Sequence, residues 1–340
     1  MRVTLGDVCE KGASNIKQSD IANMTGEYPI YGAAGYIGNV DFYHQEKPYV
    51  AIVKDGAGIG RTTLHPAKSS VIGTMQYLLP KDNVLPEYLC YVVRHMHLEK
   101  YFTGATIPHI YFRDYKNEKF NLDSLDKQAE IIEILGKAES IILKRRKELA
   151  ELDNLIKARF VELFGDPILN QKQFPVYRMD EVVEFQGGSQ PDKKFFEYEP
   201  TDDNIRLIQI RDYKTDKFIT YIPRAMAKRF CTADDIMIGR YGPPIFQILQ
   251  GIEGSFNVAL MKATPKKGNK EFVRQFLKQE CLLDYLEGMS KRTAGQDGIQ
   301  MDKLKAYPFP LPPVELQNHF EKFVNQVDKS KLLQFFCSPI

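Results

Sequence analysis

The chain has 340 residues, of which 43% are hydrophobic and 26% are charged, and its formal net charge at pH 7 is +2. This composition is ordinary for a globular protein of two or more domains, and the small net charge neither requires nor excludes a polyanionic partner. The five cysteines form no C-x-x-C pair, which argues against a disulfide framework or a zinc ribbon. We expect a cytoplasmic protein without a signal peptide or a membrane span.

Residues 1–124 predict a first mixed α/β domain that is rich in strands and turns. An aromatic and β-branched run at 49–53 predicts a strand, and residues 71–79 are a second strand candidate. Residues 86–100 predict a helix, because apolar residues recur there at helical spacing after a proline.

Residues 125–166 predict a long coiled-coil helix, which is the strongest secondary-structure signal in the chain. Apolar residues repeat every seven positions over four heptads, and charged residues fill the other faces. A helix of about 38 residues would make a rod of roughly 57 Å. Its predicted packing positions are Leu135, Ile142, Leu149, Ile156 and Leu163.

Residues 167–311 predict a second mixed domain, with strand candidates at 205–210 and 235–238 and a helix at 271–286. Residues 312–340 predict a distal coiled-coil helix of about half the length of the central one, because the last residues carry a proline and match nothing in the first helix. Its predicted packing positions are Phe320, Phe323 and Val327.

The most informative feature is an internal repeat. Phe120 and Phe309 each open an F-x-L motif, Gln128 and Gln317 each follow in an amphipathic helix, and both pairs are 189 residues apart. Near the start of each copy the interval is only 174 residues, so the second copy carries about fifteen extra residues. Repeats of this length are whole domains rather than solenoid units. The sequence therefore predicts an α+β protein with two heads, each followed by a helical spacer.

None of the motifs that resemble a catalytic site is accompanied by the residues or the secondary structure that such a site requires. The glycine-rich run 55–62 resembles a phosphate-binding loop, but Arg61 stands where a Walker loop needs lysine and no helix begins after it. The Gly-Pro-Pro run at 242–244 lacks the leading Asp or Asn of an amino-methyltransferase motif, and we interpret it as a turn. His95 and His97 would point in different directions on a helix, which makes them poor metal partners. We expect a binding protein with no catalytic residues, no metal and no cofactor.

Basic and polar residues recur at comparable places in both copies. Lys54 and Arg61 flank the first glycine loop, and Arg240 precedes the comparable glycine of the second copy. Polar, glycine-containing segments at 103–109 and 291–297 precede the two closing motifs. For a single residue a solvated charge is an equally good interpretation, but the recurrence favours contacts with DNA phosphates and base edges. The candidate DNA-binding residues are Lys54, Arg61, Thr62, His109, Lys193, Lys194, Arg240, Tyr241 and Arg292.

In their order and duplication these motifs resemble the specificity subunits of type I restriction–modification systems. The resemblance depends on the P-L-P-P-x-E-x-Q run at 310–317, its degenerate form at 121–128, the Y-P-I-Y-G segment at 28–32 and the ending of the central helix at 162–167. It implies two target-recognition domains, joined and spaced by long coiled-coil helices in a pseudo-twofold arrangement. It also implies a non-catalytic subunit that selects a split, asymmetric DNA target.

The resemblance further implies the partners: double-stranded DNA, two methyltransferase subunits and restriction subunits, with no membrane. Within this frame we expect Lys54 and Lys194 to contact phosphates. Arg61, Arg240 and His109 are the candidates for base edges.

The distal helix departs from the family pattern, in which it is about as long as the central one. We expect this to leave Leu149, Ile156 and Leu163 uncovered, for a partner subunit or a second copy. Three other classes remain open: a truncated or inactive specificity subunit that assembles only with a partner half-subunit, a coiled-coil adaptor without a DNA role, and an autonomous DNA-modifying enzyme.

Overall fold

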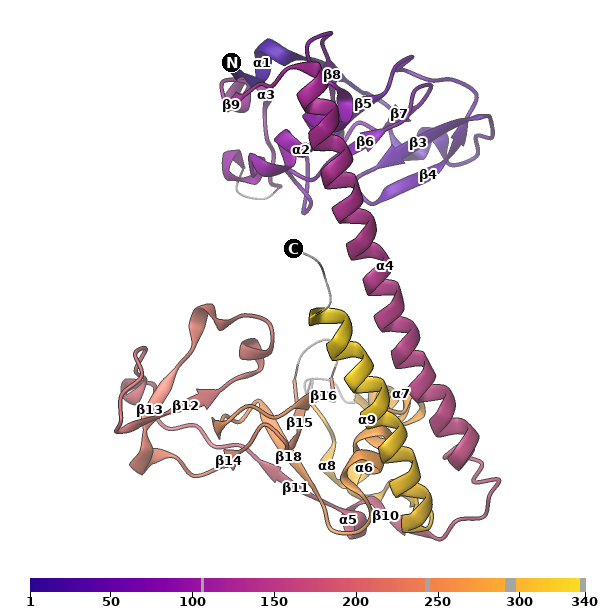
Figure 1. Cartoon of the computed structure of the whole chain (residues 1–340), viewed down its shortest axis with the longest axis vertical. Helices are drawn as coiled ribbons and strands as arrows, with labels where there is room; N and C mark the ends of the chain where they lie inside the picture. Colours follow the sequence, from indigo (N-terminus) through magenta and orange to yellow (C-terminus); the bar gives the residue numbers. More distant parts are fainter. Residues whose placement is uncertain (105–106, 242–244, 291–297, 337–340) are drawn as a thin grey trace. The chain divides into compact units, whose positions relative to one another are not determined.

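The computed structural model divides into two compact units, Met1–Lys144 and Arg145–Ile340, which we describe separately (Figure 1). Each unit contains a four-stranded antiparallel sheet, a mixed sheet with fewer residues in its strands (three strands in the first unit and four in the second), which we call the smaller sheet, and a short two-stranded pair. No helix in the described part of the chain is long and apolar enough to cross a membrane. The residues that the structure describes are 1–104, 107–241, 245–290 and 298–336.

In the first unit the larger sheet has the strand order β2-β8-β5-β6, and the smaller one has the order β4-β3-β7 with β3 and β7 parallel. The strands are β1 (Arg2–Thr4), β2 (Cys9–Ala13), β3 (Tyr28–Gly32), β4 (Gly35–Val40), β5 (Tyr49–Val53), β6 (Thr62–His65), β7 (Ser70–Val71), β8 (Met75–Pro80) and β9 (Lys119–Asn121). The helices are α1 (Leu5–Val8), η1 (Gln18–Ile21), α2 (Pro86–His95), η2 (Leu98–Tyr101), α3 (Phe112–Tyr115) and α4 (Leu125–Phe164), which runs on into the second unit.

Strand β5 confirms the prediction at 49–53, and it is buried along its whole length because both of its faces are covered. On one face Val50 and Ile52 pack with α2, and on the other Tyr49 packs with Tyr77. The single strand predicted at 71–79 is wrong, because the chain crosses between the two sheets after β7 and re-enters as β8. The predicted helix at 86–100 ends early, since His97 adopts a left-handed conformation with φ of 51° and a 3₁₀ turn follows.

The second unit repeats this topology. Its larger sheet has the order β11-β18-β15-β16, and its smaller sheet has the order β13-β12-β17-β14 with β12 and β17 parallel. The strands are β10 (Val176–Arg178), β11 (Val183–Gly187), β12 (Asn204–Ile208), β13 (Tyr221–Pro223), β14 (Phe230–Cys231), β15 (Ile236–Gly239), β16 (Gln247–Gln250), β17 (Gly254–Phe256), β18 (Leu260–Pro265) and β19 (Pro308–Pro310). The helices are α5 (Met179–Val182), η3 (Lys193–Phe195), η4 (Ile210–Tyr213), η5 (Asp216–Phe218), η6 (Arg224–Met226), α6 (Lys270–Leu277), α7 (Glu280–Ser290), α8 (Met301–Ala306) and α9 (Val314–Phe336).

Most of the extra residues of the second copy lie in one connection. Strands β3 and β4 are joined by residues 33–34, whereas β12 and β13 are joined by residues 209–220, which include η4 and η5. We call this connection the 209–220 loop. The single helix predicted at 271–286 is also wrong, because it is broken after Leu277. The break lets Phe276 of α6 and Leu282 of α7 enter the same core.

A buried glutamine fastens the long helix to its domain in each unit, which gives the repeated motif a structural reason. Gln128 accepts a hydrogen bond from the backbone N of Leu85 (2.9 Å) and donates to the carbonyl of Asp123 (2.9 Å). Gln317 accepts from the backbone N of Asn269 (2.7 Å) and donates to the carbonyl of Pro312 (2.6 Å). Both side chains are essentially inaccessible to solvent.

Helix α9 packs antiparallel on the last part of α4 within the second unit (Figure 1). The ring of Phe320 lies 5.6 Å from that of Phe160 and 5.3 Å from that of Phe164. Further along, Nζ of Lys331 lies 2.8 Å from a carboxylate oxygen of Asp153. Helix α4 stops before Gly165, whose φ is 75°.

This packing corrects the prediction of which apolar residues stay uncovered. Ile156 is buried, Leu163 packs against the core and Leu149 is half-buried, whereas Leu135 and Ile142 are 38% and 51% exposed. In an antiparallel pair the first turns of α9 meet the last turns of α4. The apolar residues that stay uncovered are therefore Leu135 and Ile142, earlier in α4, and not those near its C-terminal end as predicted. Of the predicted α9 positions, Phe320 and Val327 are buried and Phe323 is partly buried.

Candidate functional site

In the first unit, candidate residues gather where the loop between β5 and β6 meets the segment before α3. Lys54 follows β5 directly, and its backbone N donates to the carbonyl of Thr74 (3.0 Å) while its own carbonyl accepts from the backbone N of Ile110 (3.0 Å). Asp55 forms a β-bridge with His109, and its carboxylate is paired with Nδ1 of that histidine. These contacts hold the half-buried side chains of Lys54 and His109 in one place.

Two neighbours of His109 belong to the same group, although the sequence analysis did not select them. The ring of Tyr111 lies 4.1 Å from the imidazole, and the guanidinium of Arg113 lies 4.8 Å from the centre of the Tyr111 ring. Tyr111 is 42% exposed, so this stack of rings and a cation faces solvent. In the sequence these two residues belong to an aromatic and basic run directly after His109. A comparison of the two copies could not identify this run, because it does not recur in the second copy.

Arg61 and Thr62 stand at the far end of the same loop. Arg61 is exposed and donates to the carbonyl of Ala33 in the turn between β3 and β4 (2.9 Å). Gly60 has φ of 81°, and a Cβ there would lie only 2.8 Å from the backbone N of Glu99, so the turn requires glycine. Thr62 is only 5% exposed and its hydroxyl donates to the carbonyl of Gly60, which argues against a direct contact from this side chain to DNA.

The second unit builds the same kind of place around Arg240 and Tyr241. Arg240 follows β15 directly, its backbone N donates to the carbonyl of Ala259 (2.9 Å), and its guanidinium donates to the carbonyl of Val258 (3.3 Å). The guanidinium also lies 5.3 Å from the centre of the Tyr241 ring. Tyr241 is 47% exposed and forms a β-bridge with Gly298.

The two places are equivalent, position by position. Lys54 and Arg240 are each the first residue after the second-last strand of the larger sheet, and each donates its backbone N across to the residue before the neighbouring strand. The next residue in each unit forms a β-bridge, with His109 in one case and Gly298 in the other, and these two bridge partners are 189 residues apart. The structural counterpart of Arg240 is therefore Lys54 and not Arg61.

The remaining candidates do not join these groups. Lys193 and Lys194 are exposed on η3, where Nζ of Lys194 lies 5.0 Å from the centre of the Phe195 ring and 3.9 Å from the carboxylate of Asp192. Arg292 lies outside the described residues, as does the Gly-Pro-Pro run at 242–244.

A buried histidine lies at the end of β6, where it pairs with Tyr49 at the start of β5. His65 is 5% exposed and packs against Tyr31 (4.4 Å) and Tyr49 (5.3 Å). Burial lowers the pKa of His65 to about 4, so its ring is neutral near pH 7. It therefore adds no charge to the surface that Lys54 and Arg61 present.

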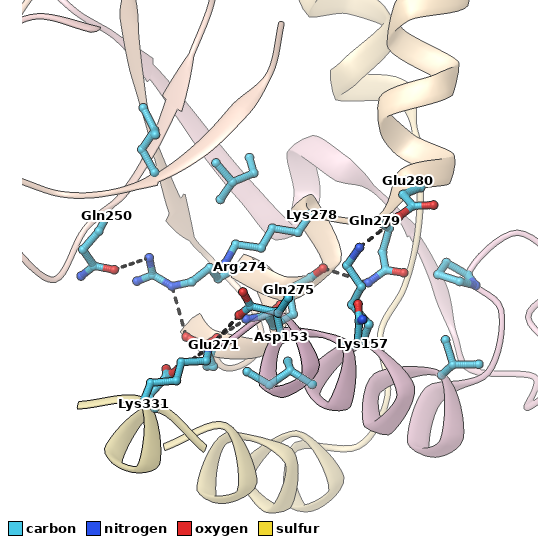
Figure 2. Close-up of a pocket in the computed structure, with 18 of the residues that line it drawn as sticks. Asp153, Lys157, Gln250, Glu271, Arg274, Gln275, Lys278, Gln279, Glu280 and Lys331 are labelled. Atoms are coloured by element: carbon cyan, nitrogen blue, oxygen red, sulfur yellow. Dashed lines mark hydrogen bonds and ion pairs between the residues drawn. The ribbon is translucent and has the colours of Figure 1, made fainter. Parts of the chain in front are cut away.

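Ion pairs line a cavity of about 920 Å³ in the second unit, where α4, α6 and α9 meet (Figure 2). Lys331 joins α9 to Asp153 of α4 (2.8 Å), and Lys157 joins α4 to Glu280 at the start of α7 (3.0 Å). Arg274 is 8% exposed and is bound on both sides, by Glu271 and by Gln250. These ion pairs link the helices to one another, because charged side chains around the cavity pair with groups of opposite charge.

In the part of the chain that the structure describes, no group of three or more His, Cys, Asp or Glu residues could hold a metal ion. What both units do present is a cation beside an exposed aromatic ring, Arg113 with Tyr111 and Arg240 with Tyr241. Such side chains contact phosphates and base edges.

Comparison with known proteins points the same way. A family model described as the type I restriction modification DNA specificity domain matches residues 1–154 and again residues 171–334. The type I restriction enzyme MjaVIII specificity subunit of Methanocaldococcus jannaschii is 21% identical over 318 residues, which cover 82% of this chain and 72% of that protein. The crystal structure of a type I restriction–modification S subunit from M. genitalium covers 98% of this chain and 90% of its own, with 15% identity and a TM-score of 0.59, so the fold is shared.

Proposed function

The chain belongs to the type I restriction–modification DNA specificity family and is a specificity subunit of such a system, and we propose that each of its two units reads one half of a bipartite, asymmetric DNA target. In this proposal the chain itself catalyses nothing. It directs two methyltransferase subunits, together with restriction subunits, to the target.

The observation that carries the proposal is the equivalence of Lys54 and Arg240. Two domains of one topology hold a cation at the same place, through the same backbone hydrogen bond and next to the same β-bridge. The bridged residues beside these cations differ, with Asp55 and His109 in one unit and Tyr241 and Gly298 in the other. A shared scaffold with unlike contact residues is what two unlike half-sites require.

Residue types divide the roles among the contacts. Lysine is a point charge that suits phosphate, so we assign Lys54 and Lys194 to the DNA backbone. Arginine can bind guanine through two hydrogen bonds, so we assign Arg61 and Arg240 to base edges, together with His109. The other proposed DNA contacts are Lys193, Tyr241 and Arg292, and Thr62 is left out because it is buried.

The assembly surface is part of the same proposal. We divide the chain into recognition domains at 1–124 and 167–311, with a central helix at 125–166 and a distal helix from 312. Ile156, Leu163, Phe320, Phe323 and Val327 pack within the second unit, whereas Leu135 and Ile142 are exposed on α4. These last two are the positions at which we expect a partner subunit to pack.

A map of methylated bases tests the proposal. The chain is expressed with the methyltransferase subunit of its own system in a host that lacks adenine methylation, and modified bases are located by single-molecule sequencing. We expect one split motif with two unlike halves. A continuous or palindromic motif would contradict the proposal, and so would no motif at all when the same methyltransferase is active beside another specificity chain.

A further inference from the structure

The 209–220 loop carries exposed aromatic and basic side chains that have no counterpart in the first unit (between β12 and β13 in Figure 1). Phe218 is 51% exposed, and two cations lie over its ring: the guanidinium of Arg211 at 5.8 Å and Nζ of Lys217 at 5.6 Å from the ring centre. With Tyr198, Asp216, Ile219 and Tyr221 these residues line a cavity of about 470 Å³. We call Arg211, Lys217 and Phe218 the cation clamp.

Buried polar contacts hold the loop in a single conformation. Arg211 and Gln209 both donate to the hydroxyl oxygen of Thr220, at 3.1 Å in each case, and Thr220 is fully buried. The buried carboxylate of Asp212 accepts from the backbone N of Gln209 (3.1 Å) and lies 3.7 Å from the guanidinium of Arg206. The contact with Thr220 therefore positions Arg211 before any ligand arrives, and Lys217 lies over the Phe218 ring of the same loop.

The charge balance of this region differs between the units. Residues 190–230 contain nine Lys or Arg against seven Asp or Glu, whereas the comparable residues 17–47 of the first unit contain two against four. Within the 209–220 loop three cations, Arg211, Lys214 and Lys217, and one carboxylate, Asp216, are exposed, while Asp212 is buried. The loop therefore adds net positive charge to the surface of the second unit.

We propose that the cation clamp binds backbone phosphates of double-stranded DNA beside the half-site that the second unit reads. This inference rests on the proposed function, since it takes the second unit to lie on DNA. Phosphate fits better than a base, because both cations already lie over the Phe218 ring and leave it poorly placed to stack on a base. Phosphate contacts carry no sequence information. The clamp lengthens the DNA contact of one unit without adding a base to the target.

Salt dependence of binding tests this directly. The full chain is titrated with a duplex that contains its methylated target and with an unrelated duplex of equal length, over a series of salt concentrations. Each neutralised phosphate contributes about 0.9 to the slope of log affinity against log salt. In the double variant Arg211→Ala/Lys217→Ala we expect the slope to fall by about 2, with a similar loss of affinity for both duplexes and an unchanged methylation motif.

Two further variants separate the clamp from general effects of charge. Lys322→Ala/Lys329→Ala removes the same charge from exposed positions on α9 and is expected to leave the slope unchanged. Phe218→Leu keeps both cations but removes the ring that positions them, and is expected to lower affinity by about two- to fivefold at an unchanged slope.

The alternative outcomes distinguish a failure of this inference from a failure of the proposed function. An unchanged slope in the clamp variant overturns this inference and leaves the proposed function standing, provided that the unaltered chain still binds its target. A loss confined to the target duplex, or an altered motif, also overturns it, because the residues would then read bases. Loss of complex formation with the methyltransferase subunit at unchanged DNA affinity would make the clamp a protein contact instead. If the unaltered chain shows no salt-sensitive DNA affinity, the proposed function itself fails.

Discussion

The two units share a scaffold and differ in what that scaffold presents. Gln128 and Gln317 fasten the long helices in the same way, and Lys54 and Arg240 occupy the same place after equivalent strands. The connection between the first two strands of the smaller sheet, in contrast, is two residues long in one unit and spans residues 209–220 in the other. The fold therefore tolerates change where loops meet solvent and keeps its contacts where helix and domain meet.

At a second pair of equivalent positions the two units again share the backbone arrangement and differ in the side chain. The carbonyl of Arg61 accepts from the backbone N of Val53, and Gln247 pairs with Gly239 at the corresponding step of the other hairpin. Arginine pairs with guanine through two hydrogen bonds, whereas glutamine pairs with adenine in the same manner. Equivalent places thus hold residue types that favour different bases.

The units also differ in how far the long helix enters the core. In the second unit Phe160 and Phe164 of α4 pack among the rings of Phe272 and Phe320. In the first unit α4 is exposed from Ile134 to Leu143 along its apolar side, where several residues are more than half exposed. The same helix is therefore a core element in its last turns and a surface element between Ile134 and Leu143.

Substitution along the helices should give the largest contrast in stability. Phe320→Ala removes a fully buried ring and is expected to destabilise the second unit by about 3–5 kcal/mol. Ile142→Ala, on the exposed part of α4, is expected to change stability by no more than about 0.5 kcal/mol. Hydrogen exchange followed by mass spectrometry reports each unit separately, and similar losses for the two variants would contradict the assigned packing.

Acid should weaken the first unit selectively. The folded protein keeps His65 neutral down to a pKa of about 4, whereas the unfolded chain protonates this residue near pH 6.5, so stability is complete above pH 6.5 and is lost as the pH falls toward 4. The loss can reach about 3 kcal/mol. The second unit has no buried histidine among its described residues, and its one histidine, His319, is exposed.

Hydrogen exchange at pH 7 and pH 5, corrected for the intrinsic rate, measures this difference. In the variant His65→Gln the step between the two pH values should shrink in the first unit. An equal acid-induced loss in both units, or a step that survives in the variant, would show that another group is responsible.

The glutamine anchors should give smaller effects that stay local. Gln128→Ala leaves the partly buried backbone N of Leu85 without its acceptor, and Gln317→Ala does the same to Asn269. We expect each variant to lose about 1–3 kcal/mol in its own unit. Protection that falls in both units for either variant would mean that the anchors connect the units rather than each helix to its domain.

The internal repeat made much of this architecture predictable. The interval of 189 residues correctly paired the closing strands and the long helices, and it relates His109 to Gly298, the two β-bridge partners. It holds because core and anchor positions cannot shift without loss of packing. The interval changes inside the repeat at the 209–220 loop, where a surface insertion costs little.

Other features could not be predicted from the sequence, because they depend on how elements pack in three dimensions. Heptad spacing located the stripe on α4, but only the antiparallel packing of α9 decides that Ile156 is covered and Ile142 is exposed. Proximity to a glycine selected Thr62 as well as Arg61, although strand alternation turns Thr62 inward. The clamp residue Phe218 gave no signal, because its meaning depends on the two cations placed over its ring.

The central claim is that each unit reads its own half of the target, and one experiment tests it most directly. Methylation motifs are mapped for the unaltered chain and for the variants Arg61→Ala and Arg240→Ala, each expressed with the same methyltransferase subunit. We expect Arg61→Ala to relax one half of the motif and Arg240→Ala to relax only the other, while the spacing between the halves stays constant. Relaxation of both halves by either substitution would contradict the claim.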